Sequence, residues 1–103
     1  MTVVFDNEEL EFLYVTPVDV LRGKQKSPSE VIRQYQKKVR LLTIVNKLEE
    51  LRNFRSLNFE YLKGNRAGYC SIRLNIQYRL LFTPIEDNKI QVLLINEISK
   101  HYE

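Results

Sequence analysis

The sequence predicts an α+β domain in which two N-terminal helices pack on a small antiparallel sheet, with the order β-α-α-β-β-β. Helical spacing of apolar residues dominates the first half of the chain, whereas residues 69–75 alternate strictly between two faces, as in a strand. The 103 residues suit one such unit, so we expect a single domain over residues 1–103. No apolar run approaches the roughly 20 residues that a membrane-spanning helix needs.

The first strand and the first helix follow from the opening residues. Thr2–Phe5 is short, β-branched and aromatic, which predicts a strand. Asp6 precedes Glu9 by three positions, the pattern of an N-cap with a matching acid, and Leu10 and Leu13 follow at helical spacing. We therefore predict a helix capped by Asp6, followed by a connector over residues 15–26, which contain Pro and Gly.

The second helix has a clear start signal. Ser27 is a suitable cap, Pro28 fits the first helical position, and Glu30 completes a capping box. The apolar residues that follow step by three or four, which predicts an amphipathic helix to about Leu51: Ile32, Tyr35, Val39, Leu42, Val45 and Leu48. Its other face carries mostly basic residues, which we expect to be solvated or to lie near nucleic acid or a partner.

The second half predicts three strands. The first alternates strictly, with Tyr69, Ser71, Arg73 and Asn75 on one face and Cys70, Ile72 and Leu74 on the other. Gln77–Thr83 forms the next strand, and Pro84 with Glu86–Asn88 supplies a turn. Ile90–Ile98 is nearly continuously apolar, which predicts a central strand covered on both faces.

The formal net charge of +3 hides an uneven distribution. Residues 1–21 hold five acids and no base, whereas residues 22–103 hold sixteen bases and eight acids. The stretch between Glu60 and Glu86 has no acid and contains four bases: Lys63, Arg66, Arg73 and Arg79. A basic stretch with interleaved aromatic residues suggests a surface for a polyanion, and a solvated sheet face is the alternative. The acids at positions 6–9 suit the N-terminus of a helix, where the helix dipole favours negative charge.

The single cysteine and the N-terminus indicate a compartment. Cys70 excludes an intrachain disulfide and lies in an alternating run, which predicts a buried, inert thiol in the reducing cytosol. One Cys and one His are too few for a zinc site, so we expect no metal and no cofactor. The opening residues lack the basic and apolar regions of a secretory signal, which favours a cytoplasmic protein.

Two segments carry a resemblance to a known family. Residues 62–80 read LKGNRAGYCSIRLNIQYRL, which resembles the signature LKGxRxGxWSIRxNxQWRI of HigB-type toxins in the RelE/ParE toxin superfamily. The run NEISKHY at residues 96–102 also resembles the C-terminal end of that group, and the likeness spans nearly the whole chain.

The resemblance implies the RelE/ParE toxin-like fold and a place in a type II toxin–antitoxin system, such as those that maintain plasmids. It implies a ribosome-dependent mRNA endoribonuclease that inhibits translation. It also implies two kinds of partner, namely the ribosome with its mRNA and a HigA-like, helix-turn-helix antitoxin.

Metal-independent RNA cleavage needs a base for the 2′-hydroxyl, cations for the phosphate and an acid for the leaving oxygen. By resemblance, Arg79 is a clamp for the phosphate in the transition state. The alternative is an arginine on the sheet face paired with Glu97. Lys63 matches the Lys of LKG and would hold phosphate or supply a proton, the alternative being a loop cation without a role.

Three further residues are candidates for the chemistry. His101 lies near the family's C-terminal His and titrates near neutrality, although a His in a tail is commonly an exposed bystander. Tyr102 would stack on a base or pack the tail on the sheet. Glu60 stands where some members have His, so it is either a general base with a raised pKa or a structural residue. Candidate RNA contacts are Arg66, Arg73, Tyr69 and Lys100.

Two other classes of function remain open on the sequence alone. The first is a non-enzymatic binding module with the toxin fold, either a ParE-type gyrase poison or an inactive toxin held by its antitoxin. The second is a general RNA-binding α+β domain, against which the absence of an aromatic RNP-type motif or a KH-type GxxG loop argues.

Overall fold

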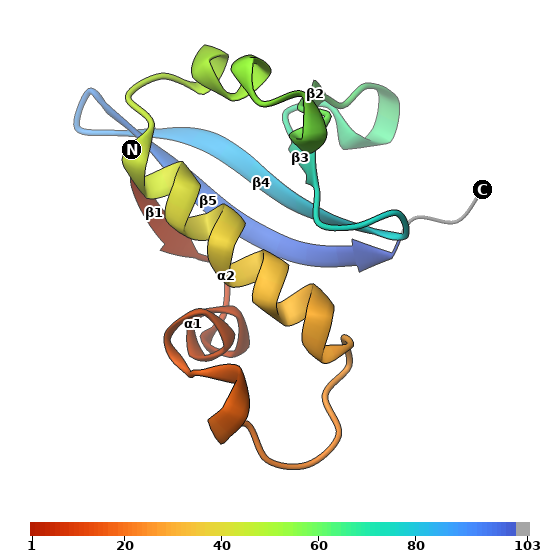
Figure 1. Cartoon of the computed structure of the whole chain (residues 1–103). Helices are drawn as coiled ribbons and strands as arrows, with labels where there is room; N and C mark the ends of the chain where they lie inside the picture. Colours follow the sequence, from red (N-terminus) through yellow and green to blue (C-terminus); the bar gives the residue numbers. More distant parts are fainter. Residues whose placement is uncertain (101–103) are drawn as a thin grey trace.

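The computed structural model describes residues 1–100, which form a five-stranded sheet with two α-helices packed against it (Figure 1). The helices are α1 (Glu8–Val15) and α2 (Ser29–Ile44). The strands are β1 (Thr2–Phe5), β2 (Glu60–Tyr61), β3 (Cys70–Arg73), β4 (Tyr78–Asp87) and β5 (Ile90–Lys100). Their order in the sheet is β1-β5-β4-β3-β2.

The predicted α+β class is confirmed, whereas the predicted order β-α-α-β-β-β lacks the short strand β2 and the predicted sheet was antiparallel throughout. β1 pairs with β5 in parallel, whereas the other neighbours are antiparallel, so the sheet is mixed. The region after α2 contains the two residues of β2 and three short 3-10 helices, at Leu48–Asn53, Arg55–Leu57 and Gly64–Arg66. A further 3-10 helix, Val18–Val20, lies in the connector between α1 and α2.

The cap of α1 is Asn7, and the prediction of Asp6 was wrong by one residue. The Asn7 side chain accepts a hydrogen bond from the backbone N–H of Leu10 at 2.9 Å. The backbone N–H of Asp6 instead donates to the carbonyl of Ile95 at 2.9 Å, which keeps Asp6 in line with β1. The helix therefore begins one residue later than the acid spacing indicated.

This difference predicts a stability effect. Replacing Asn7 with alanine removes the only side-chain acceptor at this helix start and should lower the free energy of unfolding by about 1 kcal/mol. Replacing Asp6 with alanine should cost less than half as much, because the Asp6 side chain does not cap the helix. Urea denaturation of the two variants measures the difference, and equal losses would contradict the cap assignment.

α2 begins and ends differently from the prediction. Pro28 rather than Ser27 occupies the N-cap position, with no side-chain cap, and the first helical bond runs from the N–H of Ile32 to the carbonyl of Pro28. The helix ends at Ile44, not near Leu51, because Val45 is extended. The amino nitrogen of Met1 donates to the carbonyls of Leu42, Thr43 and Val45, which satisfies the end of the helix.

The hairpin of β4 and β5 also differs from the predicted turn. β4 continues through Pro84 to Asp87, and the turn consists of Asn88 and Lys89, both with positive φ, as in a type I′ turn. β3 pairs with β4 only as far as Phe82, so Pro84 lies where β4 has a neighbour on one side only. A missing N–H is tolerated at such an edge.

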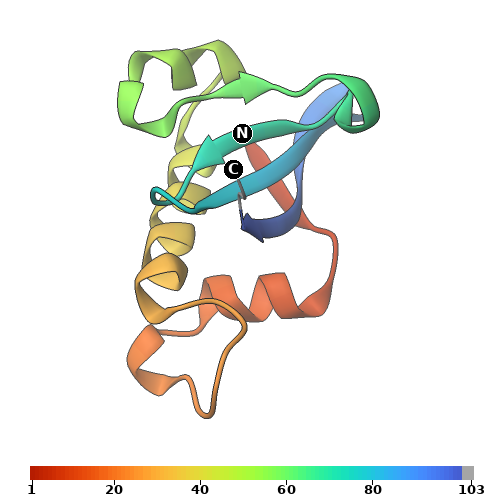
Figure 2. The same ribbon diagram turned by 90° about the vertical axis from the view of Figure 1, so that its right-hand side faces the viewer.

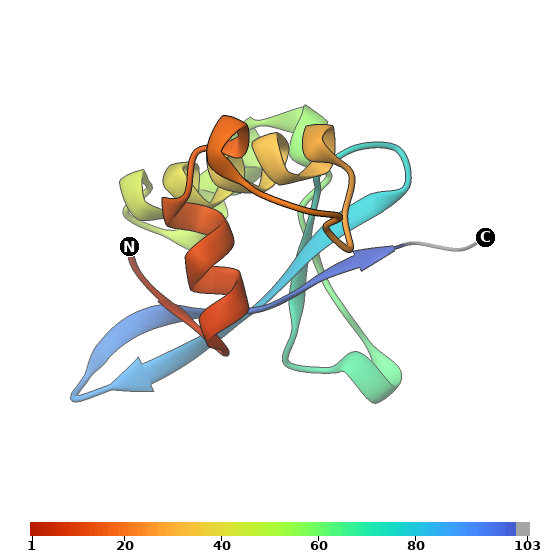
Figure 3. The same cartoon turned by 90° about the horizontal axis from the view of Figure 1, so that it is seen from below.

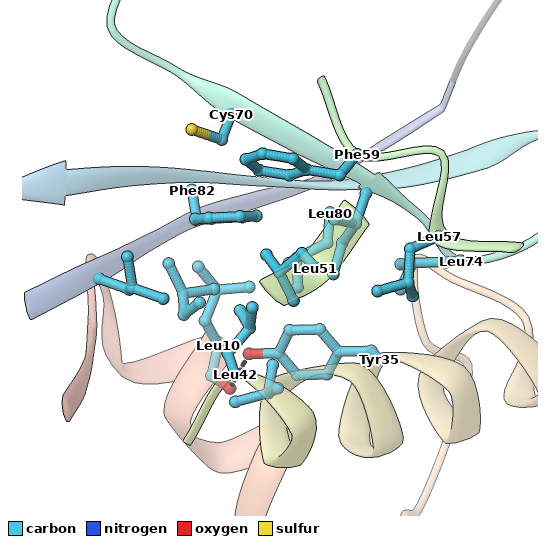
Figure 4. Packing of buried hydrophobic residues seen from close by; sticks show 14 of the residues in the cluster. Leu10, Tyr35, Leu42, Leu51, Leu57, Phe59, Cys70, Leu74, Leu80 and Phe82 are labelled. Atoms are coloured by element: carbon cyan, nitrogen blue, oxygen red, sulfur yellow. Dashed lines mark hydrogen bonds between the residues drawn. The ribbon is translucent and has the colours of Figure 1, made fainter. Parts of the chain in front are cut away.

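One hydrophobic core joins the sheet to the helices and the 3-10 segments (Figure 4). Tyr35 of α2 is fully buried, and its hydroxyl donates to the carbonyl of Leu10 at 2.7 Å. Phe82 of β4 is equally buried, and its ring stacks on Phe59 with centroids 6.4 Å apart. Cys70 lies in this core as predicted, and burial raises the pKa of its thiol to about 11.

The helices leave one face of the sheet open. α2 lies along one side of the sheet in Figure 2, and α1 packs against both α2 and β1. In β5, Leu93 and Ile95 are fully buried toward the helices, whereas Leu94 is half-buried. β5 lies between β1 and β4, so its predicted central position is confirmed, whereas the face that carries the buried Val92 and the half-buried Leu94 is only partly covered. Within residues 1–100, no helix is long and apolar enough to cross a bilayer.

Candidate functional site

The candidate site is a hollow on the open face of the sheet. Its volume is about 180 Å³, and residues from four strands and the 3-10 helix near residue 65 line it: Glu60, Leu62, Arg66, Ser71, Arg79, Leu81 and Ser99. The sheet register explains this gathering. Ser71 lies between Glu60 and Leu81 in one row across the strands, and Arg79 lies opposite Ser99 in the next row.

Arg79 of β4 is the most enclosed cation of the hollow. Only 19% of its side chain is exposed, because alternation along β4 places it on the same face as Leu81, opposite the core residues Leu80 and Phe82. Its Nη1 donates to Ser71 Oγ at 3.5 Å and lies 3.9 Å from Glu60 Oε2. Both contacts are long, so the guanidinium keeps donors for an anion.

Arg66 reaches the same hollow from the loop between β2 and β3. Its Nη1 donates to Glu97 Oε1 of β5 at 2.8 Å, and its guanidinium lies 5.7 Å from the centre of the Tyr69 ring. The hydrogen bond and the charge of Glu97 raise the pKa of Arg66, so this side chain is always a cation. The loop is thereby attached to β5 across the hollow.

Two ion pairs, Arg79 with Glu60 and Arg66 with Glu97, therefore lie at this hollow on the open face of the sheet. Planar guanidinium groups bind phosphate oxygens through paired N–H donors. A partly enclosed surface strengthens such contacts because little water competes for the charge. The arrangement suits a phosphate placed between Arg79 and Arg66, with Glu60 at its rim.

Comparison with known proteins gives the family. Residues 5–97 match the family model described as a RelE-like toxin of the type II toxin–antitoxin system HigB. The chain belongs to the HigB toxin family. Toxin HigB-1 of Vibrio cholerae serotype O1 is 40% identical over 59 residues, which cover 57% of this chain and 62% of that toxin. The match thus spans less than two thirds of this curated HigB relative.

Two solved structures share the fold of this HigB-family chain. The YoeB/ParE toxin from Agrobacterium tumefaciens has 18% identity and a TM-score of 0.57, covering 99% of this chain and 100% of that one. The YoeB-YefM complex from Staphylococcus aureus has 20% identity and a TM-score of 0.58, covering 99% and 98%. The resemblance read from the sequence and the toxin-like fold are thereby confirmed.

Three other residues that the resemblance singled out, Lys63, Arg73 and Lys100, are absent from the described lining of the hollow. Lys63 is exposed on the loop before the 3-10 helix and is outside the lining of the described hollow. Arg73 is exposed on β3 directly opposite Arg79 in the register, so it extends the basic surface. Lys100 is exposed at the end of β5, opposite Tyr78. His101 and Tyr102 lie outside the described residues.

Three residues in or beside the hollow were not predicted as site residues, although Ser71, Glu97 and Ser99 lie within the two segments that resemble HigB toxins. Ser71 is fully buried and accepts from Arg79, and Glu97 was expected, as the alternative, to pair with Arg79 but binds Arg66 instead. The alternation along residues 69–75 already placed Ser71 on the face of Arg73, which was the available signal. Ser99 lies in the C-terminal run that resembles HigB toxins, but no chemical role was predicted for it. Within residues 1–100, no three Asp, Glu, His or Cys side chains form a cluster that could hold a metal ion.

Proposed function

We propose that this HigB-family chain is a toxin that cleaves mRNA on the ribosome and thereby inhibits translation. The observation that carries this proposal is the hollow in which Arg79 and Arg66 face the open side of the sheet. A site built from two arginines and a carboxylate suits a phosphodiester better than a neutral or cationic substrate. The acid-free stretch between Glu60 and Glu86 supplies the surrounding positive charge.

In the proposed reaction, the 2′-oxygen of the RNA attacks the adjacent phosphorus and the bond to the 5′-oxygen breaks. Arg79 binds the phosphate oxygens, whose negative charge grows in the transition state, and Arg66 adds a second guanidinium. The enclosed position of Arg79 makes it the principal clamp. The products are a 2′,3′-cyclic phosphate and a free 5′-hydroxyl.

Two proton transfers complete the reaction. Glu60 lies at the rim of the hollow beside Arg79 and is our candidate for accepting the 2′-hydroxyl proton. The proton for the leaving 5′-oxygen would come from His101, with Tyr102 stacking on a base. Ser99 lines the hollow, and the chain continues from it through Lys100 into these two residues. Lys63, Arg73, Tyr69 and Lys100 would bind flanking RNA or the ribosome.

The proposed partners follow from the family and from the related complex. The YoeB-YefM structure contains a toxin with its antitoxin. We propose that this chain likewise has a cognate antitoxin, of the HigA-like, helix-turn-helix kind, and acts in the cytoplasm where ribosomes translate. A neighbouring gene for a helix-turn-helix protein of roughly a hundred residues would support this partner.

Mapping RNA 5′ ends tests the proposed activity. The purified chain is incubated with mRNA alone and with the same mRNA on programmed ribosomes, and new 5′-hydroxyl ends are mapped. We expect cuts only in the ribosome-bound sample, because the ribosome would orient the RNA for in-line attack. Intact mRNA on ribosomes, together with DNA damage in cells that express the chain, would instead indicate a gyrase poison.

A further inference from the structure

The edge hollow is a further concave surface, beside the outermost strand β2. Its volume is about 190 Å³, and its lining comes from the segment between α2 and β2: Leu51, Arg52, Phe54, Arg55, Asn58 and Phe59. Leu51 and Phe59 are buried, whereas the other four residues are exposed. The edge hollow therefore has an apolar base and a rim that carries one phenyl ring, two guanidinium groups and an amide.

The edge hollow and the hollow that contains Arg79 lie on opposite faces of the sheet. Phe59 lines the edge hollow and belongs to the core that faces the helices, whereas the next residue, Glu60, lines the hollow on the open face. In Figure 3, the 3-10 segments of residues 48–57 lie on the side of α2, and the loop of residues 64–66 lies on the other side. Because β2 is the outermost strand, a ligand chain can pass round its edge and reach both hollows.

Flat aromatic and guanidinium groups surround the edge hollow. The ring of Phe54 is 44% exposed, which is unusual for so large an apolar side chain. The guanidinium of Arg52 lies 5.2 Å from the centre of the Phe59 ring and 5.9 Å from that of the Tyr61 ring. Glu49 holds this arrangement, because it accepts from Arg52 Nε at 3.3 Å and from the Tyr61 hydroxyl at 3.0 Å. Unpaired bases stack on aromatic rings and guanidinium planes of this kind.

One positive charge of the edge hollow has no counter-ion. Glu49 pairs with Arg52 and so offsets the first guanidinium. Arg55 is exposed and makes no ion pair in the described part of the chain, and none of the described lining residues is acidic. The neighbouring acid Glu50 instead accepts from the backbone N–H of Lys47 at 2.8 Å. The uncompensated charge therefore favours an anionic ligand, and a guanidinium suits phosphate.

We propose that the edge hollow binds one unpaired nucleotide of an RNA strand whose scissile phosphate lies at Arg79. The base would stack on Phe54 and on the guanidinium of Arg52. The Asn58 amide would bond to the edge of the base, and Arg55 would bind the phosphate of the same nucleotide. A duplex hides its base faces and an acidic peptide has none, so neither would use the exposed ring. That this strand is the substrate rests on the function proposed above, whereas the preference for an unpaired nucleotide rests on the edge hollow itself.

Binding of a short RNA strand tests this proposal. The probe is a dye-labelled adenylate strand of about eight nucleotides, whose 2′-O-methyl groups prevent cleavage. We expect it to bind the full chain in fluorescence anisotropy and to shift the ring NMR signals of Phe54. A strand with the same phosphates but no bases should bind at least about fivefold more weakly and leave those ring signals unmoved. Equal binding of the two strands, no binding of either, or an unmoved Phe54 ring would overturn the proposal.

Two matched pairs of substitutions locate the bound nucleotide. Phe54→Ala should weaken binding of the adenylate strand by about 5- to 100-fold, the usual loss for one stacked base. Phe12→Ala removes an exposed ring from α1 instead and should leave binding unchanged. Arg55→Gln should weaken binding about threefold to tenfold more than Arg22→Gln, which removes the same charge from the exposed connector. Equal effects within either pair would overturn the proposal.

These readouts do not depend on RNA cleavage. If mRNA on ribosomes stays intact while the adenylate strand binds as expected, the proposed enzyme fails and the edge hollow stands as a nucleotide site. If mRNA is cut while Phe54→Ala binds the strand as well as the parent does, the edge hollow fails and the enzyme stands. A poly-aspartate peptide that displaces the strand and shifts the Phe54 ring equally would mean that charge alone selects the ligand, and would also overturn the proposal.

Discussion

Replacing Arg79 with alanine is expected to lower the rate of mRNA cleavage on ribosomes by about 10²–10³-fold, the usual loss when one enclosed donor to a developing anion is removed. Arg79 is the most enclosed cation of the hollow. In the alanine variant, a water molecule at this position would not replace the positive charge of the guanidinium. Arg79→Lys should recover part of the rate, because it restores the charge without the planar pair of donors. Single-turnover cleavage of ribosome-bound mRNA measures all three proteins.

The matched control for this prediction is Arg40→Ala. Arg40 is exposed on α2, away from the hollow, and the variant should cleave at the parent rate. Circular dichroism of each variant shows whether the fold persists. A folded Arg79→Ala variant that cleaves as fast as the parent would contradict the assignment of Arg79 as the phosphate clamp.

The largest stability effect is expected for Phe82→Ala. Phe82 is fully buried in β4, where it stacks on Phe59 and pairs in register with Cys70 and Ile95. Removing its ring leaves a cavity between the sheet and the helices, and we expect the free energy of unfolding to fall by about 3–5 kcal/mol. That is a large share of the roughly 5–15 kcal/mol typical of a domain. Urea denaturation measures it.

Phe12→Ala provides the comparison for the same change of side chain. Phe12 lies on α1 with 54% of its surface exposed, so its truncation should alter the free energy of unfolding by less than about 0.5 kcal/mol. Similar losses for the two variants would mean that Phe82 does not occupy the centre of the core.

Local patterns in the sequence predicted burial better than they predicted the ends of elements. Val45, Leu48 and Leu51 are buried, as their spacing indicated, but they follow α2 in an extended residue and a 3-10 helix. A period of three to four residues fits both kinds of helix, so it could not locate Ile44 as the end. The parallel pairing of β1 with β5 depends on contacts between distant segments, which no local pattern carries.

The part of the site that lies on the strands could be predicted from the family resemblance, whereas the part that lies on the loop could not. The family resemblance singled out Arg79, and the hollow brings it beside Glu60 and Arg66; the roles of all three stay predictions. The contact between Arg66 and Glu97 joins a loop to a distant strand, so its geometry depends on the folded loop. In the same loop Lys63 is exposed, although the resemblance suggested Lys63 as a catalytic residue and Arg66 only as an RNA contact.

The parallel pairing of β1 with β5 determines when the hollow can form during synthesis of the chain. During synthesis, Thr2–Phe5 emerge first, yet their partners Val92–Ile95 emerge almost a whole chain later. Ser99, which completes the lining of the hollow, follows those partners. Pairings across such long separations close slowly and late in folding. A nascent chain that still lacks β5 therefore carries an unfinished sheet, and the hollow assembles only after Ser99 has been synthesised.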